Sequence, residues 1–289
     1  GSIMTFIAQL SQDNGNITLK KFDGASFPRF NPGHSGLDIV KVCFLDLETT
    51  GLDKIEDKII ELALKLLAID RNNGELLGVI AEYQSFHDPN ELIDEKITLI
   101  NGINNEMVQD YSIDWDEVNN LISTADIILA HNASFDRAFM DRYLSLSTEK
   151  VWSCSISDID WLKRGFTSNK QELLCFWHGF YYDSHRAMFD VDALIGLLTH
   201  ESYEENKPMI ELLENASKPY YKLLALDSPY DTKDKLKAKD YNWDPERRSW
   251  WKRLQLVEIE TEQNWLTENI YNGHFTGSVE EIPLTDKYK

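Results

Sequence analysis

Two acidic residues close an apolar stretch in Phe44-Leu45-Asp46-Leu47-Glu48-Thr49-Thr50-Gly51. The apolar run that leads into it, residues 39–45, is typical of a buried strand in a sheet covered on both faces. Because residues two apart in a strand point to the same face, Asp46 and Glu48 should project side by side. Two such charges are unfavourable there unless a cation lies between them, and carboxylates favour hard divalent metals. The alternative is a strand that simply ends in polar residues at the surface.

The composition limits the class of protein. The chain has 289 residues and 42% hydrophobic residues, enough for one large and one small domain. Its net charge of -20 argues against broad electrostatic binding of nucleic acid, so such a partner would have to be held locally by metal and a few basic patches. The three cysteines lack paired metal spacing, and neither a membrane span nor a signal peptide is indicated. We expect a cytoplasmic protein that does not contact membranes.

The order of apolar segments predicts an α/β fold with a mixed sheet. Three consecutive strands joined by tight turns come first, and strands alternating with helices follow, which argues against a purely parallel sheet. We expect an N-terminal extension (1–36), the α/β domain (37–203), a helical connector (204–218) and a small α+β module (219–289). The first expected strand begins at residue 39 and carries Asp46 and Glu48 before the turn at 49–51, and the others are 58–69, 76–86, 126–130 and 151–154. One expected helix carries Asp136 in its first turn and continues to about Leu144, and the others are 90–98, 104–110, 115–124, 156–163, 170–179 and 186–199.

Two further acidic positions follow at strand-to-helix junctions or inside helices. Asp136 lies in the first turn of a helix that Ser134 is expected to cap. Asp190 lies beside the apolar stripe of the helix at 186–199, whereas Asp192 should point away from the stripe and be solvated. His185 should stand in the loop just before this helix, where a histidine is suited to proton transfer.

These positions, in this order, resemble the DEDDh family of 3′–5′ exonucleases, and are closest to the branch of the proofreading epsilon subunit of bacterial DNA polymerase III. The resemblance covers roughly residues 38–200. It rests on three segments of this chain: Asp46-Leu47-Glu48-Thr49-Thr50-Gly51, His131-Asn132-Ala133-Ser134-Phe135-Asp136 and His185-Arg186-Ala187-Met188-Phe189-Asp190.

The resemblance implies a ribonuclease H-like fold with a five-stranded sheet, and two Mg²⁺ or Mn²⁺ ions held by Asp46, Glu48, Asp136 and Asp190. Asp46 would bridge the ions and His185 would act as the general base. The resemblance also implies that the terminal nucleotide is gripped near Thr49, Thr50, Leu52, Asn132 and Phe135. Phe135 could equally be a core aromatic residue.

The expected reaction is release of nucleoside monophosphates from the 3′ ends of single-stranded DNA. An RNA-directed exonuclease is the alternative enzyme. A third possibility is a non-catalytic nucleic-acid-binding subunit of a replication or repair complex, although a pure binder has no need of buried charge. The choice between DNA and RNA depends on contacts to one sugar hydroxyl, which the sequence does not reveal.

The C-terminal module carries a locally basic stretch. Residues 219–254 contain nine Lys or Arg and six Asp or Glu, a net charge of +3. Basic residues mixed with aromatic ones suit single-stranded nucleic acid, although the tryptophans could instead form the core of the module. The candidate patch consists of Lys233, Lys237, Trp243, Arg247, Arg248, Trp250, Trp251, Lys252 and Arg253.

Overall fold

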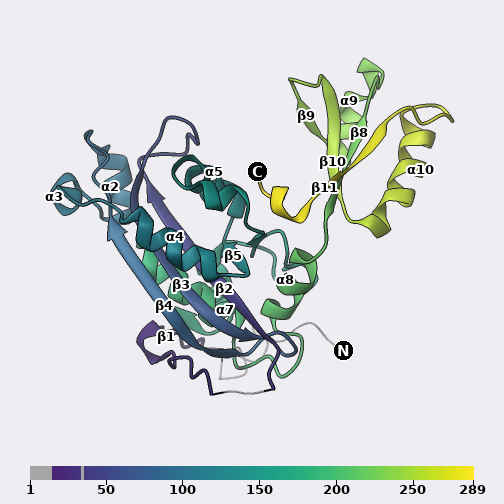
Figure 1. The fold of residues 1–289 in the computed structure, drawn as a ribbon. Coiled ribbons are helices and arrows are strands. Elements are labelled where there is room, and N and C mark those ends of the chain that lie inside the picture. The colour runs from purple at the N-terminus through teal and green to yellow at the C-terminus, as the bar shows by residue number, and fades with distance from the viewer. Residues whose placement is uncertain (1–14, 34–35) are drawn as a thin grey trace. The chain divides into compact units, whose positions relative to one another are not determined.

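A computed structural model describes residues 15–33 and 36–289, and it divides into two compact units (Figure 1). The first unit holds the chain up to Ala216 together with Tyr288–Lys289, and the second holds Ser217–Lys287. Residues 1–14 and 34–35 of the expected N-terminal extension lie outside the described residues. Within the described ranges, no helix combines the length and apolar character needed to cross a membrane.

A five-stranded mixed sheet forms the centre of the first unit, as predicted. Its order is β4-β3-β2-β5-β6; the β4-β3-β2 strands are antiparallel and the β2-β5-β6 strands are parallel, which is the ribonuclease H-like arrangement. The strands are β2 (Ile39–Thr49), β3 (Ile59–Asp70), β4 (Leu76–Phe86), β5 (Ile127–Ala130) and β6 (Trp152–Cys154). Every residue of β3 is buried, charged ones included, so those charges need partners inside the fold.

Helices cover both faces of this sheet. Figure 1 shows α4 and α5 in front of it and α7 behind it, where α7 packs against β2 and β3. Even-numbered residues of β2 join the core cluster with α7, so Asp46 and Glu48 lie on the α7 side. The helices are α2 (Glu95–Asn101), α3 (Asn105–Val108), α4 (Trp115–Thr124), α5 (Ala133–Tyr143), α6 (Gln171–Trp177), α7 (Ala187–Leu198) and α8 (Pro208–Ala216), with a 3₁₀ turn η2 (Ser145–Thr148).

Two local predictions were wrong. Residues 156–163 form turns rather than a helix, because the Asp158 carboxylate accepts from the Cys154 N–H and the Trp161 indole donates to the Ser155 carbonyl. Ser134 lies inside α5 and does not cap it; the N-cap residue is Asn132, in a left-handed conformation at φ 71°.

The described N-terminal segment is part of the first unit. β1 (Lys20–Lys21) pairs with β7 (Phe180–Tyr181), and the 3₁₀ turn η1 (Gly24–Ser26) contacts α7. A Cβ on Gly24 would lie 2.3 Å from the Asp192 carboxylate, so only glycine allows this approach.

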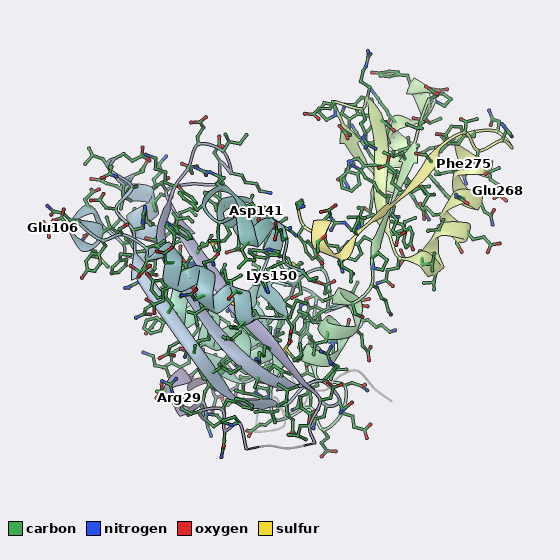
Figure 2. All side chains as sticks on the ribbon, in the orientation of Figure 1. Arg29, Glu106, Asp141, Lys150, Glu268 and Phe275 are labelled. Carbon is green, nitrogen blue, oxygen red and sulfur yellow. The ribbon has the colours of Figure 1, made fainter. Side chains whose placement is uncertain are left out.

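The second unit has a core of its own. Its antiparallel sheet has the order β11-β8-β10-β9, in which β9 and β10 form a hairpin. Phe275, labelled in Figure 2, packs against a buried cluster that includes Leu223, Leu236 and Leu266. The elements are β8 (Tyr220–Ala225), η3 (Tyr230–Thr232), α9 (Lys233–Ala238), β9 (Asn242–Asp244), β10 (Ser249–Leu254), η4 (Leu256–Glu258), α10 (Ile259–Asn269), β11 (Ser278–Ile282) and η5 (Leu284–Asp286).

Candidate active site

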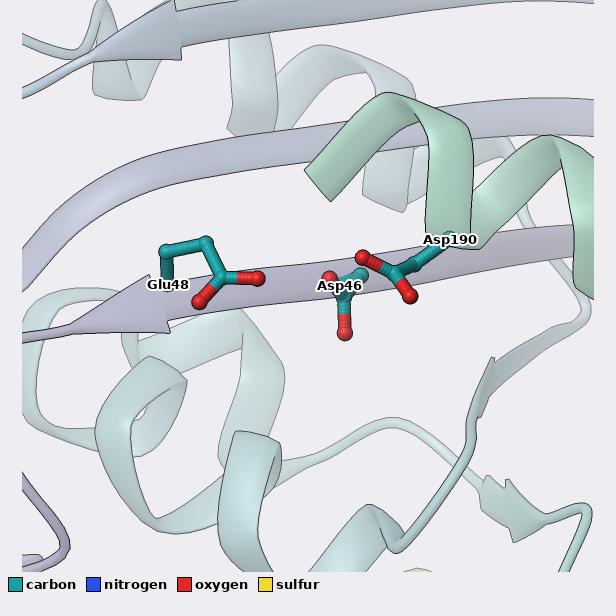
Figure 3. A group of neighbouring side chains, drawn as sticks. All are labelled: Asp46, Glu48 and Asp190. Carbon is teal, nitrogen blue, oxygen red and sulfur yellow. The ribbon is translucent and has the colours of Figure 1, made fainter. Parts of the chain in front are cut away.

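Three carboxylates meet where β2 passes under the first turn of α7 (Figure 3). Asp46 and Glu48 come from β2 and Asp190 comes from α7. One carboxylate oxygen of each lies within 4.8 Å of those of the other two. The sequence placed these residues on separate elements, and the fold brings them together.

Asp136, the fourth predicted carboxylate, lies in the first turn of α5 and is only 3% exposed. It accepts a hydrogen bond from the Leu47 backbone N–H, between the two acidic residues of β2. Among the described residues, the only buried side-chain oxygen or nitrogen atoms without a hydrogen-bond partner are Asp136 Oδ1 and Asp190 Oδ2. Such groups are unfavourable in a folded protein unless something else binds them.

Burial raises the pKa of every carboxyl in this group. Desolvation is the largest cause at Asp46 and Asp136, with repulsion from the neighbouring acids added to it. The same causes raise the pKa of Glu48 to about 8, against a lowering by Asn101, and desolvation raises that of Asp190 to about 7. Four hard oxygen donors that repel one another are a suitable ligand set for divalent metal ions.

The loop before α7 contains His185 and contributes contacts to the Asp190 carboxylate. Asp190 Oδ1 accepts from the Tyr182 hydroxyl at 3.2 Å, and the His185 backbone N–H also bonds to the Asp190 carboxylate. His185 itself is solvent-exposed in a turn with φ 69°, so its predicted place in the loop before the helix is confirmed.

The prediction that Asp192 is solvated was wrong. Its side chain is 13% exposed and lies 2.5 Å from the Nζ atom of Lys65, which is 7% exposed. Lys65 belongs to the fully buried strand β3, and its charge needs a partner there. Helical periodicity could not reveal this partner because Lys65 is far away in the sequence.

The residues expected to grip a nucleotide differ in their availability. The Thr49 hydroxyl donates to the Gly51 carbonyl at 2.7 Å, and the Thr50 hydroxyl donates to Asp57 and accepts from the Lys58 N–H. Both hydroxyls therefore shape the turn after β2.

The other three residues expected to contact a nucleotide are Leu52, Asn132 and Phe135. Leu52 is 84% exposed, and Asn132 is exposed at the start of α5. Phe135 is half-buried, with its ring 5.0 Å from that of Phe139. Leu52 and Asn132 are thus free to touch a ligand, whereas Phe135 also contributes to packing.

Two residues near the site were not singled out in the sequence. Asn101, 5% exposed at the end of α2, points its amide at Glu48 Oε2 from 3.4 Å. Tyr182 supports Asp190 as described above. Asn101 acts through a residue 53 positions away, and the contact of Tyr182 spans a loop to a residue eight positions away, so neither follows a strand or helix period.

The C-terminal candidate patch does not form one surface. Trp250 packs on the core of its unit, and Lys252 bonds to the Lys239 carbonyl and lies 3.6 Å from Glu262. Trp251 and Arg253 alternate with them in β10 and therefore point to the opposite face. Of the others, Lys233 contacts Tyr230, Arg247 pairs with Glu280, Trp243 lies against Trp250, and Lys237 and Arg248 are exposed.

Comparison with known proteins gives consistent matches. The exonuclease family model, RNase_T, matches residues 43–198. DNA polymerase III PolC-type of Listeria welshimeri is 30% identical over 175 residues, which is 57% of this chain and 11% of the polymerase. The Bacillus subtilis polymerase of the same type is 28% identical over 221 residues, 69% of this chain and 15% of the polymerase. The chain thus spans a small part of the length of these relatives.

A solved structure, exonuclease X in complex with 5′ overhanging duplex DNA, aligns with a TM-score of 0.42 and 20% identity, covering 59% of this chain and 99% of that one. The family model alone covers more than half of the 289 residues and contains Asp46, Glu48, Asp136, His185 and Asp190. The chain therefore belongs to the exonuclease family, as a DEDD-type 3′–5′ exonuclease.

Proposed function

We propose that this exonuclease releases nucleoside monophosphates from the 3′ ends of single-stranded DNA, with two Mg²⁺ or Mn²⁺ ions in its active site. The observation that carries the proposal is the pair of unpartnered buried oxygens, Asp136 Oδ1 and Asp190 Oδ2, beside Asp46 and Glu48. A binding subunit without catalytic activity would gain nothing from these uncompensated charges.

Each side chain has a distinct part in this mechanism. Asp46 lies between Glu48 and Asp190 (Figure 3) and would be a ligand of both ions, while Glu48, Asp136 and Asp190 would complete their ligand shells. Two ions so held would activate the attacking water and stabilise the leaving 3′ oxygen. His185, exposed beside Asp190, would accept the proton from that water. Tyr182 and the His185 backbone would keep the Asp190 carboxylate in place.

The terminal nucleotide would contact Leu52 and Asn132, with Phe135 at its side and the Thr49–Thr50 turn offering backbone groups. DNA is favoured over RNA because the sequence relatives are DNA polymerases by name. The same kinship supports a polymerase or repair complex as the partner. An RNA-directed activity is the alternative for the same site.

Product analysis tests this function. 5′-labelled single-stranded DNA, duplex DNA and RNA are incubated with the full chain in Mn²⁺, in Mg²⁺ and in EDTA. We expect stepwise shortening from the 3′ end, fastest on single-stranded DNA and absent in EDTA, with His185→Ala slower by about 10² to 10⁴-fold. Internal cleavage, or cleavage in EDTA, would contradict the mechanism, and faster shortening of RNA would reassign the substrate.

A further inference from the structure

Helix α7 carries Asp190 in its first turn but lacks a cap of its own. Its N-cap residue, Arg186, makes no side-chain hydrogen bond to the helix backbone. The buried first N–H of the helix, on Ala187, instead donates to Glu61 Oε1 at 2.8 Å. Glu61 lies in β3, so the start of α7 is capped by a carboxylate from the sheet beneath it.

The Glu61 carboxylate also forms an ion pair with Arg186. Arg186 Nη2 lies 3.1 Å from Glu61 Oε2, and its guanidinium lies over the ring of Phe86 at 5.1 Å. The Glu61 side chain is only 9% exposed. A buried carboxylate that caps a helix and pairs with an arginine at once fixes both the position of the helix and the direction of that arginine.

Glu61 is a close neighbour of the acidic cluster. It pairs directly with Glu48 across β2 and β3, and therefore lies on the same face of the sheet. Its oxygens are taken by Arg186 and Ala187, and it is not part of the group of Asp46, Glu48 and Asp190 whose oxygens lie within 4.8 Å of one another. Glu61 therefore lies next to the acidic cluster, but its carboxylate oxygens are already bonded and it is not available as a metal ligand.

We propose that Glu61 is a positioning residue of the active site. By capping α7 it sets the place at which Asp190 meets Asp46 and Glu48, and by binding Arg186 it keeps a cation from occupying the space between the metal ligands. This inference rests on the proposed metal-dependent function.

The alternative is an ion pair that only stabilises the fold. The same helix offers a matched example, since Asp192 pairs with Lys65 of β3 a short way along α7. Asp192→Asn therefore weakens a comparable contact between α7 and β3 and leaves the start of the helix intact, which makes it the control.

The experiment uses the full chain and four variants: Glu61→Gln, Arg186→Gln, the double variant Glu61→Gln/Arg186→Gln, and Asp192→Asn. Mn²⁺ binding is measured by calorimetry, and the Mn²⁺ concentration for half-maximal rate, kcat, and KM for single-stranded DNA are measured beside it. Thermal unfolding in EDTA reports stability.

Glu61→Gln keeps an acceptor for the Ala187 N–H but releases Arg186 beside the acidic cluster. We expect its half-saturating Mn²⁺ concentration to rise about 10 to 100-fold, with KM for DNA nearly unchanged. The double variant should recover most of that loss, because the freed cation is gone and the acceptor stays. Asp192→Asn should unfold at a lower temperature with unchanged Mn²⁺ dependence.

Two outcomes would overturn the positioning role while the enzyme itself is active. One is a Glu61→Gln variant that loses thermal stability as Asp192→Asn does but binds Mn²⁺ as the unmodified chain does. The other is a double variant with no recovery of Mn²⁺ affinity. If the unmodified chain neither binds Mn²⁺ nor hydrolyses DNA, the proposed function itself is contradicted. This result differs from the two outcomes above, in which the unmodified chain is active.

Discussion

Asp190 and Asp192 lie two residues apart on α7, and the groups around their carboxylates differ. Asp192 has a cation supplied by the chain, Lys65 at 2.5 Å. Asp190 has a hydroxyl and a backbone N–H on its side, two other carboxylates near it, and one oxygen without a partner. The chain itself supplies the counter-charge of Asp192, whereas under the proposed function a metal ion would supply that of Asp190.

The largest expected difference is in turnover. Asp190→Asn should reduce the hydrolysis rate by at least ~10³-fold, because removing one metal ligand disrupts a two-ion site. Asp192→Asn should stay within a few-fold of the unmodified chain. The rates are measured on 5′-labelled single-stranded DNA at saturating Mn²⁺. Equal losses in the two variants would mean that the comparison misassigns the helix faces.

In the absence of metal, the stability of the fold should depend on Asp192 rather than on Asp190. Asp192→Ala leaves Lys65 with only the more distant Glu82 carboxylate, at 3.5 Å, and should lower the free energy of unfolding by about 1 to 3 kcal/mol. Asp190→Asn removes one of several repelling charges and should raise it. Both are read from urea denaturation in EDTA, and a destabilised Asp190→Asn would show that the acidic cluster does not strain the metal-free fold.

A buried histidine, His178, should make the stability of the fold depend on pH. His178 is 4% exposed, with its ring nitrogens 2.6 Å from the Leu174 carbonyl and 2.7 Å from the Tyr203 hydroxyl, and desolvation lowers its pKa to about 4. Below pH 6.5 the unfolded chain therefore binds a proton that the folded chain does not. Stability should fall as the pH drops from 6.5 toward 4, by up to about 3 kcal/mol for this residue.

The check on this prediction is the same denaturation series with His178→Gln. The variant should be less stable at neutral pH, since it loses fitted contacts, but its stability should depend less on pH between 6.5 and 4. An identical pH slope in both proteins would assign the acid sensitivity to other groups.

The smallest expected effects concern two adjacent tryptophans of the second unit, whose substitution should change different properties. Trp250 packs on that unit's core, so Trp250→Ala should lower thermal stability. Trp251 lies on the other face with Lys222 over its ring at 4.5 Å, and Trp251→Ala should weaken binding of long single-stranded DNA by about 1 to 3 kcal/mol if a base stacks there. Fluorescence anisotropy measures this binding. Unchanged affinity in Trp251→Ala would remove that face from the nucleic-acid interface.

The sequence predicted those parts of the site that local rules govern. Alternation in β2 placed Asp46 and Glu48 on one face, and the turn before α7 placed His185 outside the helix. Contacts between distant segments were beyond such rules. Lys65 with Asp192, and Glu61 with the start of α7, pair residues more than 120 positions apart, and no period of 2 or 3.6 residues encodes them. The absent helix at 156–163 has a different and local cause, since side-chain contacts to the backbone four and six residues away replaced its regular hydrogen bonds.

The most direct test of the account is the number of metal ions that the carboxylates hold. Mn²⁺ is titrated by calorimetry into the metal-free full chain, and into Asp46→Asn, in the presence of a saturating nucleoside 5′-monophosphate. We expect two bound ions per chain and, in Asp46→Asn, the loss of at least one of them, because the proposed mechanism makes Asp46 a ligand of both. No saturable Mn²⁺ binding by the folded, unmodified chain, or the same binding in Asp46→Asn, would contradict the claim that these buried charges are left open for metal.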